Sequence, residues 1–82
     1  MKQEVRFFHC NEREEVIEIE SYIEENGAII SQKESRPIPD QPFAALKVQL
    51  EQAGWRVALA GTTRLGHSPV LANSYVARRP VS

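Results

Sequence analysis

The sequence contains a single cysteine, Cys10, among its 82 residues. One thiol excludes an internal disulfide framework and a zinc site built from several cysteines of one chain, and it fits a reducing compartment. Long apolar runs are also missing, since no stretch approaches the roughly 20 apolar residues of a membrane-spanning helix. The N-terminus carries charge at Lys2, Glu4 and Arg6, where a signal peptide requires an apolar run. We therefore expect a cytoplasmic protein with no membrane partner.

No arrangement of residues typical of an active site stands out. Gly61 and Gly66 have the glycine spacing of a Walker A motif, but His67 follows where that motif requires lysine. His9 and Cys10 are neighbours on a predicted strand, so their side chains point to opposite faces and cannot form a nucleophile–base pair. The sequence thus predicts a protein that is not an enzyme, with no catalytic residue, no cofactor and no metal site.

The length of the chain limits the size of its core. A chain of 82 residues buries only about 60–65% of its unfolded surface, which is too little for two separate cores. We therefore expect a single domain over residues 1–82. With so thin a core, association into a homo-oligomer is the expected source of further stability.

Charge is distributed unevenly along the chain, although the net charge is only −1. Residues 1–41 carry five basic and ten acidic residues, whereas residues 42–82 carry five basic residues and one acidic residue, Glu51. The two halves either neutralise each other across the folded domain or leave one end as an anion-binding face.

Residues 12–25 fit two kinds of secondary structure. Asn11 can cap a helix, Glu14 follows three residues later as in a capping box, and the many glutamates suit a helix better than a strand. The same residues alternate between apolar and polar, and Asn26-Gly27 is a typical turn of a β-hairpin. We favour the helix, and a β-hairpin over residues 14–34 is the alternative.

The other elements follow from shorter patterns. Strands are expected at residues 5–10, 28–34, 55–60 and 70–79. A second helix is expected after Asp40, with Pro42 in its first turn, up to residue 53. The apolar face of that helix consists of Phe43, Leu46, Leu50 and Ala53. Asp40 can cap the helix, Gly54 ends it, Trp55 should press onto it, and Pro80 should end the last strand.

The predicted fold class is α+β. The element order β-α-β-α-β-β gives a two-layer sandwich, in which a mixed sheet of about four strands carries both helices on one face.

Our first functional hypothesis is a small non-enzymatic regulatory module that acts through protein–protein contacts as a homo-oligomer. It places the interaction surface on acidic residues of the predicted first helix, opposite a basic C-terminal hairpin. The candidate residues are Glu14, Glu18, Glu20 and Glu24.

The alternative hypothesis is binding of single-stranded RNA or DNA through the basic hairpin. Guanidinium groups hold phosphates and an aromatic ring stacks on a base, so arginines beside a tyrosine suit this function. The candidate residues are Arg56, Arg64, His67, Tyr75, Arg78 and Arg79.

Overall fold

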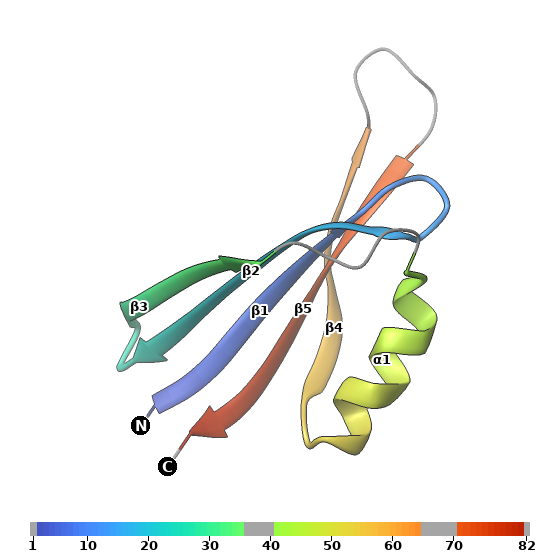
Figure 1. Ribbon diagram of the computed structural model, residues 1–82. Coiled ribbons are helices and arrows are strands. Elements are labelled where there is room, and N and C mark those ends of the chain that lie inside the picture. Colours follow the sequence, from blue (N-terminus) through green and yellow to red (C-terminus); the bar gives the residue numbers. More distant parts are fainter. Residues whose placement is uncertain (1, 36–40, 65–70, 82) are drawn as a thin grey trace.

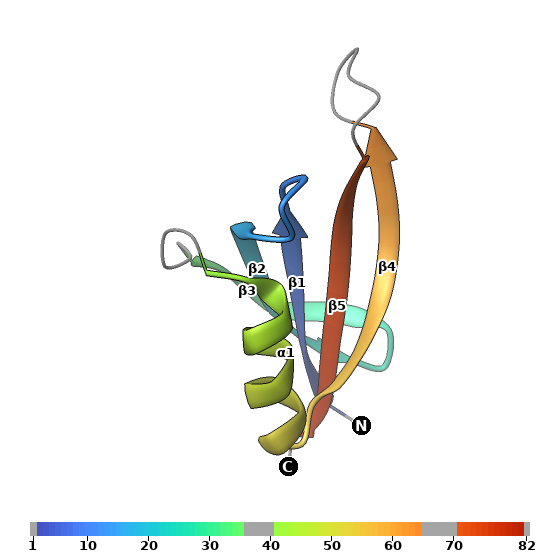
Figure 2. The same ribbon diagram turned by 90° about the vertical axis from the view of Figure 1, so that its right-hand side faces the viewer.

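A computed structural model describes residues 2–35, 41–64 and 71–81 of the chain. Its elements are β1 (Lys2–Cys10), β2 (Val16–Glu25), β3 (Ala28–Ser35), α1 (Phe43–Gln52), β4 (Arg56–Arg64) and β5 (Leu71–Val81). The five strands form one antiparallel sheet in the order β3-β2-β1-β5-β4, so the first and last strands pair at its centre. The helix α1 lies on one side of this sheet (Figures 1 and 2).

The predicted fold class is wrong, because residues 12–25 do not form a helix. They contribute the strand β2, which pairs with β1 on one side and with β3 on the other. The fold is therefore mainly β with one small helix, and every strand pair is antiparallel rather than mixed. Pairing on both sides supplies the backbone hydrogen bonds that a short glutamate-rich helix would otherwise have made for itself.

The alternative hairpin over residues 14–34 is the arrangement that the structure contains. Asn26 and Gly27 both have positive φ, at 53° and 86°, as a type I′ turn requires. Asn11, expected to cap a helix, instead builds a turn: its Oδ1 accepts hydrogen bonds from the backbone N–H groups of Arg13 and Glu15 at 2.9 and 3.0 Å. The same side-chain chemistry that caps helices therefore serves the β1–β2 turn.

The second predicted helix is confirmed as α1. Phe43 and Leu50 are buried and Leu46 packs against them, whereas Ala53 is exposed just beyond the end of the helix. Trp55 presses onto this helix as expected and is buried. The core cluster consists of Phe8, Cys10, Val16, Phe43, Leu50, Trp55 and Ala77. Asp40, the predicted cap, lies outside the described residues.

The last strand does not end before Pro80, as the sequence suggested, but continues to Val81. Strand β4 begins at Arg56, opposite Arg78, so at Pro80 the strand β5 is paired only with Gln3 of β1. A proline is tolerated where a strand has a neighbour on one side only, because its missing N–H then leaves no gap in a hydrogen-bonded ladder.

Candidate interaction face

The two faces of the sheet differ in what covers them. In β5, Tyr75, Ala77 and Arg79 point to the side of α1, and Val76 and Arg78 point to the opposite side, because successive residues of a strand alternate. We call the side opposite α1 the open face. No helix or strand among the described residues covers it, and Figure 2 shows the sheet with α1 on one side.

Two arginines meet on the open face. Arg56 of β4 lies directly opposite Arg78 of β5 in the strand register, and both side chains are exposed. Neither of them forms an ion pair with another residue in the described parts of the chain. Like charges directly opposite one another on a sheet cost stability, so this pair is held in place without a local electrostatic benefit.

The arginines border an open groove of about 540 Å³. We call it the arginine groove, and its open-face residues are Gln3, Arg56, Ala58, Val76, Arg78 and Pro80. The small and apolar members form its floor, and the guanidinium groups supply its hydrogen-bond donors. Its chemistry suits an anionic group carried on an extended, partly apolar segment.

An aromatic row lies beside the arginine groove on the open face. Phe7 is stacked between His9, with ring centroids 6.4 Å apart, and Tyr22, with ring centroids 6.0 Å apart. His9 also hydrogen-bonds Ser74 Oγ through Nδ1 at 2.9 Å, and its Nε2 lies 3.6 Å from Glu20 Oε2. These contacts fix the rings as a half-buried ridge along β1 and β2.

Three of the four predicted acidic interaction residues lie on the same face, along β2. Glu18, Glu20 and Glu24 pair with His9, Phe7 and Gln3 of β1 respectively, and so share their face. Glu24 Oε1 accepts a hydrogen bond of 3.3 Å from the Gln3 amide, which connects the acidic strand to the arginine groove. The open face is thus acidic along β2 and basic along β4 and β5.

Glu14, the fourth predicted acidic residue, belongs to a different part of the molecule. It lies in the β1–β2 turn with φ at 59°, and its carboxylate accepts hydrogen bonds from Tyr75 and from the amide of Asn73. Glu14 therefore ties the turn to β5 and is not part of the acidic strand.

Tyr75, predicted to stack on a nucleic-acid base, is not available for that role. Its ring stacks on Phe43 with centroids 4.0 Å apart, and its hydroxyl donates to Glu14 Oε2 at 2.7 Å. The hydrogen bond to the Glu14 carboxylate, together with burial, raises the pKa of Tyr75 above its ordinary value. The Tyr75 ring is therefore part of the contact between the sheet and α1 and is not free to stack on a base.

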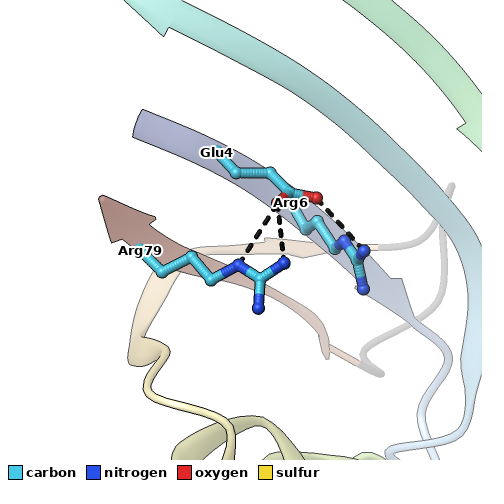
Figure 3. A network of polar contacts seen from close by, with 3 residues as sticks. All are labelled: Glu4, Arg6 and Arg79. Carbon is cyan, nitrogen blue, oxygen red and sulfur yellow. Dashed lines mark hydrogen bonds and ion pairs between the residues drawn. The ribbon is translucent and has the colours of Figure 1, made fainter. Parts of the chain in front are cut away.

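Arg79 is likewise on the side of α1. Its Nε and Nη2 donate to Glu4 Oε2 at 3.2 and 3.1 Å, and Arg6 Nη2 donates to Glu4 Oε1 at 3.2 Å (Figure 3). Both guanidinium groups also lie over the Trp55 ring, at 4.7 Å for Arg6 and 4.6 Å for Arg79. This cluster of one carboxylate, two guanidiniums and one indole joins β1 and β5 to the segment between α1 and β4.

The two remaining predicted basic residues cannot be added to the site. Arg64 ends β4 and pairs with Leu71 through its backbone, but its side chain lies outside the described residues, as does all of His67. Of the six candidates for nucleic-acid binding, the structure brings together only Arg56 and Arg78.

The sequence-based prediction missed Phe7 and Tyr22 as residues of the site. A usable signal was present, because Phe7 and Phe8 are adjacent on a strand and one of them must therefore face away from the core. Phe8 is buried under α1, which leaves Phe7 on the open face.

Cys10 is a buried free thiol, and burial raises its pKa from 9.0 to about 11, so at neutral pH it is a protonated core residue.

Within residues 2–35, 41–64 and 71–81, no three histidine, cysteine or acidic residues gather as a metal site would require. No helix in the same ranges is long and apolar enough to cross a membrane. Comparison of the chain with family models, curated proteins and solved structures gives no match.

Proposed function

We propose that this chain is a non-enzymatic protein-interaction module that holds carboxylate side chains of a protein partner in the arginine groove. The observation that carries the proposal is the pairing of Arg56 with Arg78, both exposed and both without a carboxylate partner in the described part of the chain. A bound carboxylate would relieve the repulsion between the two guanidiniums and form charge-assisted hydrogen bonds with them.

A protein partner fits the open face better than a nucleic acid does. A nucleic acid would bring a row of phosphates across the whole face, and the carboxylates of Glu18, Glu20 and Glu24 on β2 would repel them. Three arginines line the groove and one of them, Arg79, is already bound to Glu4, whereas sequence-independent binding of a strand requires a longer basic track. An extended peptide instead can place two acidic side chains over the arginines and apolar side chains over Ala58 and Val76.

Fluorescence anisotropy with a labelled peptide tests this proposal. The probe is an extended peptide with glutamate at two alternate positions, and the matched control has glutamine at those positions. Two exposed ion pairs of about 0.5–1 kcal/mol each should make the glutamate peptide roughly 5- to 30-fold tighter. The advantage should shrink as salt is added, because exposed ion pairs are screened.

The matched protein variants are Arg56→Gln with Arg78→Gln, and Arg13→Gln as a control. Arg13 is an exposed arginine of the β1–β2 turn, so its replacement removes the same charge away from the groove. The groove variant should lose the preference for glutamate and the control should keep it. A labelled single-stranded oligonucleotide is measured in parallel, and tighter binding of it through Arg56 and Arg78 would overturn the choice of a protein partner.

A further inference from the structure

From the arrangement of charge on the open face, we infer that the partner is a second copy of this chain, packed sheet to sheet about a twofold axis that runs along β1. The inference rests on the proposed function, because the arginine groove is again the contact surface and the new element is the identity of the partner. Its support is the register of the charges across the sheet.

One row of residues crosses the open face from β3 to β4. Val5 pairs with Tyr22 on one side and with Arg78 on the other, and Arg78 pairs with Arg56. Tyr22 pairs in turn with Gln32 of β3, so the row is Gln32, Tyr22, Val5, Arg78, Arg56, with both arginines at one end and the glutamine and tyrosine at the other. Its centre is apolar, since Val5 is fully buried in the sheet.

Carboxylates flank this row on both sides at its tyrosine end. On the open face, the row on one side runs through Gln3 to Glu24 of β2, and the row on the other side runs through Phe7 to Glu20 of β2. Side chains on one face of a strand are spaced by roughly 7 Å, so the two carboxylates bracket Tyr22 within the reach of an arginine side chain.

A twofold rotation about an axis along β1 keeps each row at its own level and exchanges its two ends. Strand β5 of one copy then lies over β2 of the other, and β4 lies over β3. Arg78 therefore lies over Tyr22, between Glu20 and Glu24, and Arg56 lies over Gln32 of β3. Because the interface is isologous, the same contact forms a second time with the roles reversed. The arrangement supplies carboxylates to Arg78 directly, and the long side chain of Arg56 can reach the same carboxylates from the neighbouring strand, about 5 Å away.

The centre of the face suits the same arrangement. Phe7 lies on β1 beside the axis, so its ring meets the same ring of the second copy, above the buried floor of Val5 and Val76. A twisted sheet turned about its own middle strand follows the contour of the original, which is the aligned packing found in β-sandwiches. The dimer has four layers, with α1 of each copy on the outside.

The mass in solution, measured by light scattering over a dilution series, tests this inference. The chain should change from 9.3 kDa to twice that value as concentration rises. A basic-side variant (Arg56→Glu with Arg78→Glu) and an acidic-side variant (Glu20→Arg with Glu24→Arg) should each weaken self-association by more than about 10-fold, because like charges then face each other.

Mixing the two variants gives the decisive result. In the mixed dimer one contact keeps its natural charges and the other has them reversed, so both are attractive and the dimer mass should return. Circular dichroism checks that each variant keeps its sheet, and the milder pair Arg56→Gln with Arg78→Gln should show a smaller effect in the same direction. A mixture that stays monomeric, or single variants that dimerise like the original chain, would overturn the inference.

The outcome also separates this inference from the proposed function. A chain that is monomeric at every concentration but binds the glutamate peptide through Arg56 and Arg78 disproves the second copy as partner and keeps the interaction module. A chain that neither self-associates nor binds the peptide disproves both.

Discussion

Tyr75 donates a hydrogen bond of 2.7 Å to Glu14 Oε2 across 61 positions of the sequence. This bond connects β5 with the β1–β2 turn, and the backbone oxygen of Glu14 in turn accepts from the N–H of Phe43 at 2.8 Å, at the start of α1. One turn residue therefore holds the last strand and the helix in place together.

Tyr75→Phe should lower the free energy of unfolding by about 1 kcal/mol, since it removes the hydroxyl and keeps the stacked ring. Combined with Glu14→Gln, the loss should be less than the sum of the two single losses, because both changes weaken the same bond. Urea denaturation measures all three variants. Tyr22→Phe is the control, as the Tyr22 hydroxyl has no hydrogen-bond partner among the described residues. Strictly additive losses would show that the bond contributes nothing.

Stability should fall at alkaline pH partly through Cys10. Its pKa is raised from 9.0 to about 11, so the folded chain keeps a proton that the unfolded chain releases. The contribution is fully present below pH 9 and is lost as the pH rises towards 11. Replacing Cys10 with alanine should flatten this fall, even though the variant starts from a lower stability. An unchanged slope of unfolding free energy against pH would contradict the burial of the thiol.

The same thiol should react slowly in the folded protein. A thiol reagent at neutral pH should modify Cys10 only as fast as the core opens, because the side chain is buried and protonated. The denatured chain provides the reference rate. Labelling of the native chain at that reference rate would show that Cys10 is accessible.

Glu4→Gln should destabilise the fold by about 1 kcal/mol or more, because it removes the carboxylate that binds Arg6 and Arg79 beside Trp55. The loss should be smaller in high salt, where these partly exposed ion pairs are screened. Glu12→Gln, an exposed residue of the β1–β2 turn, is the matched control and should have little effect. Equal losses for the two variants would leave the cluster without a role in stability.

Gly27→Ala should cost about 1 kcal/mol of stability, because φ at this position is 86° and an alanine side chain is strained there. Gly61→Ala is a suitable comparison, since Gly61 does not have positive φ and an added Cβ meets no atom within 4 Å. Thermal melts of both variants should show a clearly larger drop for position 27. A similar drop at both positions would contradict the turn conformation.

The secondary structure could be predicted from the sequence where one pattern dominated. The face formed by Phe43, Leu46 and Leu50 fits only a helix, and it is one. Residues 12–25 fit two patterns, and local propensity favoured the wrong one. The sheet decided the outcome, because β2 is paired on both sides and a single-sequence pattern does not show which strands will be its neighbours.

The candidate site could be predicted only in part. Positions 75 and 79 lie an even number of residues apart on one strand, so Tyr75 and Arg79 must share a face, and Arg78 must lie on the other one. The alternation of side chains along a strand therefore already shows that the predicted nucleic-acid-binding residues cannot all lie on one face of the sheet. That Arg56 lies opposite Arg78 depends on the register between β4 and β5, which also contains a bulge between Leu59 and Gly61, and no pattern in the sequence gave that register.

The pairing of β1 with β5 determines when the sheet can form during synthesis of the chain. Lys2 pairs with Val81, so the middle of the sheet cannot close until residue 81 has left the ribosome. Until then, β1 has one free edge and its apolar residues Val5 and Phe8 lack their final neighbours. Sheets closed by such distant segments fold in milliseconds to seconds rather than microseconds. Until β5 has emerged, the nascent chain is therefore exposed to aggregation and to chaperones.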